Sequence, residues 1–265
     1  MAKDFTFGTY EKLLQTGSDS NYEHLTVREY FFNDPPEHFI INRHDVDRKP
    51  KNALKMAMLE NDYGISSTYY FRTIKETFRP EIIRKIASLG HEIGYHYEDL
   101  DRTQGDFGKA LKSFKNELER LREITTIDTV CMHGNSLSKW TNIDLWEKAS
   151  LADYDLIGEA YLSIDFDDVI YFSDTGRTWR NTEIGPIFCD FLPKLSRDKG
   201  TPGVNDKIEI DSTKKLMELF RSHKFDGIYI LSHPNRWADN KMEWCIELGK
   251  DSFRNMAKLG IKIVL

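Results

Sequence analysis

The sequence predicts an α/β fold built on a parallel sheet. Short apolar runs of strand type alternate along the chain with helix-like stretches, and this alternation is typical of β-α-β units whose strands run parallel. No linker rich in Pro, Gly or Ser and no internal repeat divides the chain. Its 265 residues fit one large domain or two small ones. We therefore expect a parallel sheet, either open or closed into a barrel.

The first half of the chain carries the clearest elements. A helix is expected over residues 50–63, since Pro50 stands at its start and Gly64 lies just past its end. Asp106 caps a longer helix in which apolar residues recur at helical spacing. The other elements expected here are strands at 39–41, 68–71, 91–96 and 129–132 and a helix at 81–89.

The second half is less regular, above all between residues 150 and 205. The elements expected there are strands near Ile170 and Ile187, a helix that Asp211 or Ser212 caps and that runs to Ser222, a strand at 228–231, a helix at 242–259 and a last strand at 261–265. Residues 1–38 precede the alternation and carry a helix at about 10–14 and a candidate for a second. We expect them to pack on the outside of the main body, residues 39–265, as an N-terminal extension.

Composition excludes several classes of protein. Apolar residues make up 40% and charged residues 30% of the chain, as in globular proteins and unlike disordered ones. The formal net charge of −6 argues against nucleic acid as a partner. No apolar run is long enough for a transmembrane segment, and the N-terminus has no secretory pattern. Three widely spaced cysteines, Cys131, Cys189 and Cys245, indicate reduced thiols. We therefore expect a cytoplasmic protein.

Four predicted strands end in polar residues, and these ends carry the candidate chemistry. The segments are Arg43–Asp47, His96–Asp99, His133–Asn135 and His233–Asn235. The C-terminal ends of parallel strands meet on one face, where the active sites of such folds lie. Each His or Asp alone is more commonly a structural residue. Together, imidazoles and carboxylates suit Zn, Fe, Mn, Co or Ni and are typical of metal-assisted hydrolysis.

A fifth segment, around Gly176, places an arginine and a tryptophan next to a turn. Arg177 and Trp179 could hold a sugar through a charged hydrogen bond and ring stacking. The alternative is a packed surface loop without a role in binding.

These motifs resemble those of the polysaccharide deacetylase family, the NodB-like carbohydrate esterases of family four, over about residues 39–265. Gly90-His-Glu-Ile-Gly-Tyr-His96 is similar to that family's second motif, and Arg43-His-Asp-Val-Asp47 to its first. Leu231-Ser-His233 is similar to its Leu-x-His motif, and Asp174–Trp179 to its Asp/Arg…Trp motif. The sequence looks closest to a subgroup commonly assigned to surface-polysaccharide biosynthesis.

The resemblance implies a distorted (β/α) barrel of about seven parallel strands and the metal-dependent hydrolysis of an N-acyl group, usually N-acetyl, on a sugar. Carried over by position, Asp45 would be the general base and His233 the general acid, while Asp47 and His96 would be metal ligands. We expect substrate contacts from the polar residues around them. These candidates are Arg43, Glu98, Asn135, Arg177 and Trp179.

The chain departs from the family's pattern at the third metal ligand. The family has a second histidine four residues after His96, where this chain has Leu100, and the third motif, Arg-x-x-Pro-Tyr, is absent. His133 or Glu98 would then complete the ligand set, or the metal is lost. We place His133 first, because a ligand from a separate strand suits tetrahedral or octahedral geometry. Zn is the metal expected first, with Mn, Co, Ni or Fe as alternatives.

The sequence therefore predicts a hydrolase that removes an acetyl or formyl group from the nitrogen of a sugar, in a nucleotide- or lipid-linked precursor of a glycan. Two alternatives stay open. One is a catalytically inactive, deacetylase-like protein that binds a sugar or serves as a scaffold. The other is a metal-independent hydrolase of a small cyclic amide, which such a barrel can also host.

Overall fold

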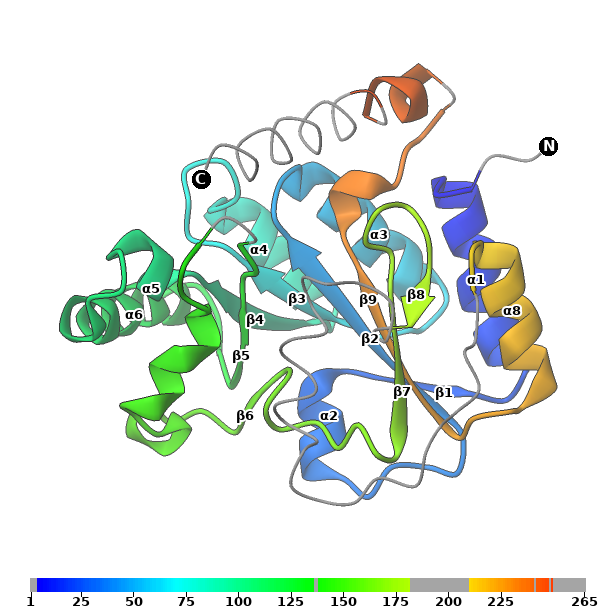
Figure 1. The fold of residues 1–265 in the computed structure, drawn as a ribbon. Coiled ribbons are helices and arrows are strands. Elements are labelled where there is room, and N and C mark those ends of the chain that lie inside the picture. The colour runs from blue at the N-terminus through cyan, green and yellow to red at the C-terminus, as the bar shows by residue number, and fades with distance from the viewer. Residues whose placement is uncertain (1–3, 136–137, 182–209, 241, 248, 250–265) are drawn as a thin grey trace.

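The computed structural model describes residues 4–135, 138–181, 210–240, 242–247 and 249. They form a nine-stranded sheet in which eight strands follow the order β6-β5-β4-β3-β2-β9-β7-β8 and β1 pairs with β2. The seven strands from β6 to β7 run parallel, and the sheet curls into a half-barrel with helices around it (Figure 1). The predicted distorted (β/α) barrel of about seven parallel strands is thereby confirmed.

The strands are β1 (Glu23–Leu25), β2 (Phe39–Val46), β3 (Thr68–Phe71), β4 (Glu92–Tyr97), β5 (Thr129–Met132), β6 (Gly158–Glu159), β7 (Val169–Ser173), β8 (Arg180–Asn181) and β9 (Gly227–Ser232). The α-helices are α1 (Phe7–Asp19), α2 (Val27–Phe32), α3 (Pro50–Asp62), α4 (Pro80–Ser88), α5 (Asp99–Arg102), α6 (Phe107–Arg122) and α8 (Thr213–Ser222). Three short 3-10 helices are η1 (Asn142–Glu147), η2 (Leu151–Tyr154) and η3 (Pro234–Arg236). Residues 242–247 are also helical.

Most elements lie where the sequence predicts them, because local signals fix their ends. Helix α3 begins at Pro50, and Gly64, at φ +68°, follows its end. The side chain of Asp106 accepts from the backbone N–H of Lys109 at the start of α6. Ser212, rather than Asp211, caps α8. The strands expected near Ile187 and at 261–265, most of the helix expected at 242–259, and Cys189 lie outside the described residues.

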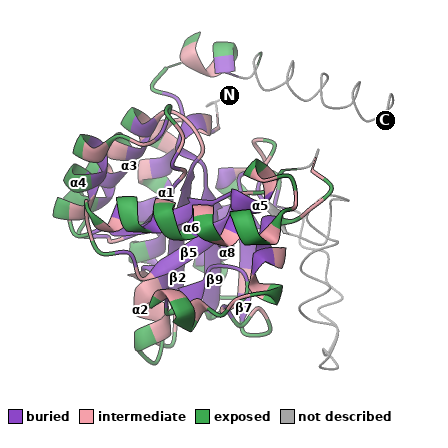
Figure 2. Cartoon of the chain, turned by 90° about the vertical axis from the view of Figure 1, so that its left-hand side faces the viewer, coloured by how far each residue is buried: buried purple, intermediate pink, exposed green. Residues whose placement is uncertain are grey.

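The strands form the centre of the molecule and the helices its surface. All eight residues of β2 are buried, and Figure 2 shows exposed residues mainly on the outward faces of the helices. Strand β2 pairs with β3 on one side and with β9 on the other, all in parallel. Their C-terminal ends therefore lie along one edge, as the strand-end segments required. None of the helices in the described part of the chain has the length and apolar character needed to cross a bilayer.

Residues 1–38, which we expected to pack outside the main body, also take part in the sheet. Strand β1 pairs in parallel with β2, with Glu23 opposite Phe39. Apolar residues of this segment lie in the common core. They include Phe5, Tyr10, Leu13, Leu14, Tyr22 and Val27. Short strands such as β1 escape sequence analysis because three residues carry too little periodicity.

Candidate active site

The first part of the site is a buried ion pair within β2. Arg43 and Asp45 share a face of the strand because residues two apart point the same way. Their side chains form two hydrogen bonds, Nε to Oδ1 at 2.8 Å and Nη2 to Oδ2 at 2.7 Å. Burial alone would raise the pKa of Asp45, but the guanidinium beside it outweighs burial, and the pKa lies below its usual range. Asp45 is therefore ionised.

Arg43 is fully buried, which corrects its expected role as a substrate contact. Its guanidinium lies 4.3 Å from the centre of the Tyr161 ring and donates to the hydroxyl of Tyr161 at 3.1 Å. It points into the barrel, beneath the strand ends, where it holds Asp45 in place.

The second part of the site is a cluster of one carboxylate and two imidazoles. Asp47 follows β2, His96 lies in β4, and His133 follows β5. Their ligand atoms all lie within 4.8 Å of one another. Oδ1 of Asp47 is 3.4 Å from Nε2 of His96 and 3.5 Å from Nε2 of His133. That Oδ1 atom is buried and accepts no hydrogen bond from the described residues, so the cluster fits a divalent cation between the three side chains.

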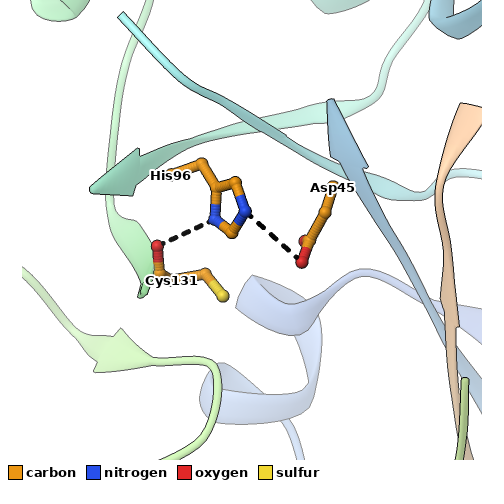
Figure 3. Close-up of side chains that lie close together, drawn as sticks. All are labelled: Asp45, His96 and Cys131. Carbon is orange, nitrogen blue, oxygen red and sulfur yellow. Dashed lines mark hydrogen bonds and ion pairs between the residues drawn. The ribbon is translucent and has the colours of Figure 1, made fainter. Parts of the chain in front are cut away.

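His96 is oriented through the ring nitrogen that faces away from Asp47. Nδ1 of His96 lies 3.0 Å from the backbone oxygen of Cys131, and since a carbonyl only accepts, Nδ1 carries the proton. Nε2 faces Asp45 (Figure 3) and lies 3.4 Å from Oδ1 of Asp47. Burial would lower the pKa of His96, but Asp45 and Asp47 outweigh it and raise the pKa. Burial lowers the pKa of His133 to about 4, so its ring is neutral and free to ligate.

A second group, Asp45, His96 and Cys131, also brings three potential ligand atoms within 4.8 Å. A cation already lies against two of them: Nη2 of Arg43 is 2.7 Å from Oδ2 of Asp45 and 2.6 Å from Sγ of Cys131. Burial also raises the pKa of the Cys131 thiol well above its usual range, and the thiolate is the form that binds metal. The cluster of Asp47, His96 and His133 therefore fits a metal better.

The third part of the site is His233 with a buried carboxylate that the sequence analysis missed. Nδ1 of His233 donates to Oδ1 of Asp174 at 2.7 Å, and the backbone N–H of His233 donates to Oδ2 at 2.8 Å. Asp174 also accepts from Arg236 at 2.6 Å. Burial would raise the pKa of Asp174, but Arg236 and His233 lower it. Nε2 of His233 then lies 3.9 Å from Oδ2 of Asp47.

Asp174 carried a usable signal. It follows β7 directly, just as Asp47 follows β2, and it opens the segment in which the sequence analysis chose Arg177 and Trp179 instead.

Glu98 lies beside the cluster but is shared by two arginines. It accepts from Nη2 of Arg72 at 2.5 Å and from Nη2 of Arg102 at 3.0 Å, neither of which the sequence analysis named. Its Oε2 is 3.5 Å from Nδ1 of His133. The carboxylate is thus on the far side of the His133 ring from Asp47, which separates it from the three candidate ligand atoms. Leu100, at the position of the family's missing histidine, is fully buried in α5.

The remaining predicted substrate contacts are Trp179, Arg177 and Asn135. Trp179 is fully buried and its indole N–H donates to Thr213 at 2.8 Å, so it belongs to the core and does not stack on a sugar. Arg177 donates to the backbone oxygen of Arg236, and Arg236 follows His233 by three residues in the chain. Asn135 is exposed on the loop after β5.

No family model and no curated protein matches the chain. Solved structures do match. A CE4 esterase from Streptococcus mutans is 14% identical with a TM-score of 0.43, over 81% of this chain and 94% of that one. A family 4 carbohydrate esterase from Bacillus anthracis is 12% identical with a TM-score of 0.36, over 96% and 90%. The peptidoglycan deacetylase PdaC from Bacillus subtilis is 13% identical with a TM-score of 0.38, over 86% and 99%. These neighbours are esterases and deacetylases of the kind that the sequence motifs resemble.

Proposed function

We propose that the chain is a metal-dependent hydrolase that removes an N-acyl group from a sugar. The observation that carries the proposal is the meeting of three units at one edge of the sheet. They are the Arg43–Asp45 pair, the cluster of Asp47, His96 and His133, and the His233–Asp174 pair. A carboxylate kept ionised, a metal-fitting cluster and an oriented imidazole are the parts that amide hydrolysis needs.

Asp47, His96 and His133 would hold the metal, with Zn first because its catalytic sites use three N or O ligands and an open position. When bound, it would supply a Lewis acid for the acyl carbonyl and for water. His133 then takes the place of the histidine that Leu100 replaces.

The proton transfers fall to two side chains. Asp45, which Arg43 keeps ionised, takes a proton from the attacking water. His233 gives a proton from Nε2 to the departing amine, while Asp174 holds the proton on Nδ1. The base and the acid are thus different groups in different surroundings. The base is a carboxylate with a lowered pKa, and the acid is an imidazole that is hydrogen-bonded to a second carboxylate.

The substrate we propose is an N-acetylated or N-formylated sugar in a nucleotide- or lipid-linked glycan precursor, handled in the cytoplasm. The motif subgroup linked to surface polysaccharides supports this context. The solved structures similar in fold include one described as a peptidoglycan deacetylase.

One observation favours an inactive sugar-binding protein instead: Leu100 stands where the resembled family has a metal ligand. The paired Asp45 and the braced His233 weigh against that reading, because binding alone requires neither a base nor an acid.

Release of acetate from N-acetylglucosamine, its oligomers and its uridine-diphosphate derivative tests the proposal. The protein is first stripped with a chelator and then reloaded with Zn, and bound metal is measured by mass spectrometry. We expect one bound metal per chain, activity that chelation removes, and activity that Zn restores. Turnover that survives chelation would overturn the metal mechanism, and sugar binding without any turnover would support the inactive alternative.

A further inference from the structure

Glu98 is held rigidly next to a ring nitrogen that lacks a partner. Nδ1 of His133 is buried and forms no hydrogen bond with the described residues. The nearest acidic group is the Glu98 carboxylate, with Oε2 at 3.5 Å. Arg72 fixes Oε2 and Arg102 fixes Oε1, and the side chain of Glu98 is only 9% exposed. A carboxylate held at both oxygens keeps its orientation when the neighbouring ring moves by a few tenths of an ångström.

The chemistry of the pair decides which nitrogen of His133 carries the proton. Arg72 donates to Oε2 of Glu98 and Arg102 donates to Oε1, and a carboxyl group that pairs with two guanidinium groups is a carboxylate. An ionised carboxylate only accepts hydrogen bonds. Nδ1 must therefore be the protonated nitrogen, which leaves the lone pair of Nε2 pointing toward Asp47, 3.5 Å away.

The other two histidines of the pocket follow the same rule. Nδ1 of His96 faces the backbone oxygen of Cys131, and Nδ1 of His233 faces Asp174. In both rings Nε2 is the atom turned to the pocket. Metal-ligating histidines commonly use such outer partners to fix the ring and its tautomer.

We propose that Glu98 is a positioning residue for His133: its carboxylate accepts the Nδ1 proton and thereby directs Nε2 to the metal. The inference rests on the proposed function for the metal, but the tautomer it requires exists in the metal-free protein. Of the two residues left open by the sequence, His133 is then the ligand and Glu98 its support.

The first measurement needs no metal. Nitrogen-15 spectra of the histidine rings, with the His133 signals identified from His133→Ala, report which ring nitrogen is protonated in the stripped protein. We expect the proton on Nδ1 in the wild type. In Glu98→Asp the side chain is one methylene shorter, and we expect the ring to lose its preference for the Nδ1–H tautomer. A wild-type ring protonated on Nε2, or a tautomer that Glu98→Asp leaves unchanged, would overturn the proposal.

The second measurement is Zn affinity by calorimetry. We expect Glu98→Asp to bind Zn about 10–100-fold more weakly, although it keeps the negative charge. The matched control is Glu117→Gln, which removes a carboxylate that pairs with Arg120 on α6, away from the strand ends, and should leave the affinity unchanged. If Glu98→Gln weakens binding while Glu98→Asp does not, Glu98 acts through charge alone and the proposal is wrong.

The two failures remain distinguishable. A wild type that binds no Zn contradicts the proposed function, while the nitrogen-15 spectra still decide the tautomer. If Zn binding depends on His133 but the Zn affinity is the same in the wild type and in Glu98→Asp, only the role of Glu98 is contradicted.

Discussion

At the scale of single residues, the site separates two aspartates by the partners that each receives. Asp45 lies against Arg43 inside the barrel, whereas Asp47 faces His96 and His133 at the strand ends. Burial would raise the pKa of both carboxyls, but Arg43 holds the pKa of Asp45 below the usual range, and the hydrogen bond from His96 with the nearby histidines does the same for Asp47. Asp45 is thus tied to a fixed charge, whereas Asp47 lies open toward two imidazoles, and this difference supports the roles of base and ligand that we propose for them.

Asp45→Asn should therefore abolish turnover while Zn stays bound. Removing a general base costs about 10²–10⁴-fold in rate, and Asp45 is not among the side chains that would hold Zn. Activity and bound metal are measured on the same preparation, with Asp47→Asn as the contrasting variant that loses metal. Metal that disappears with Asp45→Asn would make Asp45 a ligand.

Asp174→Asn should slow catalysis without loss of Zn. The amide has no negative charge to stabilise the imidazolium that gives its proton from Nε2, and it can turn an N–H toward Nδ1, where that imidazolium needs an acceptor. We expect a fall in kcat of about 10²–10⁴-fold with little change in KM. Steady-state kinetics and metal analysis check this, and an unchanged kcat would show that His233 is not the acid.

At the scale of elements, a buried network fixes β2, the strand that carries Asp45. His44 points to the opposite face from its neighbours, toward α3, and its Nε2 lies 2.7 Å from Oε1 of Glu60. Glu60 also accepts from the hydroxyls of Tyr10 and Tyr69, each at 2.5 Å. Burial would raise the pKa of Glu60, but His44 and its other partners lower it to about 2. The network thus joins α1, α3, β2 and β3 behind the site.

Glu60→Leu should lower the free energy of unfolding by about 3–5 kcal/mol, since it leaves the partners of a buried charge unpaired. Asp62→Asn, at an exposed position of the same helix, should change it by less than about 0.5 kcal/mol. Urea unfolding measures both, and equal effects would contradict the network's role.

The lowered pKa of Glu60 also predicts how the free energy of unfolding depends on pH. The folded pKa of Glu60, about 2, lies below the ordinary value of about 4.3. Its contribution is therefore complete above the ordinary value and is lost as the pH falls toward 2. Between these limits the wild type should lose more stability than Glu60→Leu does. If the free energy of unfolding falls equally steeply with pH in the wild type and in Glu60→Leu, Glu60 is not ionised in the folded protein.

The sequence predicts what local signals determine and misses what distant packing decides. Pro50 marks a helix start through its ring, and Asp106 and Ser212 do so through side chains that accept from backbone N–H groups, so these elements lie where expected. The burial of Trp179 depends on Phe5 and Trp237, whose rings lie 5.9 and 6.1 Å away. Contacts across such sequence distances leave no periodic trace.

The same limit applies to the site. The strand-end histidines and aspartates are visible as motifs because each follows an apolar run. Their supporting groups are not, because Arg72, Arg102 and Arg236 look like ordinary surface charges in the sequence. Only the fold shows that Arg72 and Arg102 share Glu98 and that Arg236 reaches Asp174.

At the scale of the whole molecule, the N-terminal segment, residues 1–38, is an integral part of the fold and not only a cover on its surface. Asp4 accepts from Thr213 at the start of α8. Thr6 forms a bridge with Ala238, and Tyr10 reaches Glu60. With β1 paired to β2, the segment contacts parts of the barrel that lie early and late in the chain.

We therefore predict that residues 39–265, the main body expected from the sequence, do not fold without residues 1–38. The six buried apolar side chains of the extension each contribute about 1.5–3 kcal/mol by burial. Together they contribute as much as the whole net stability of an ordinary domain, which is about 5–15 kcal/mol. The truncated chain should lack a cooperative unfolding transition in calorimetry and should regain one when a peptide of residues 1–38 is added. A truncated chain that unfolds cooperatively at the midpoint of the full chain would show that the barrel stands alone and that the extension only covers it.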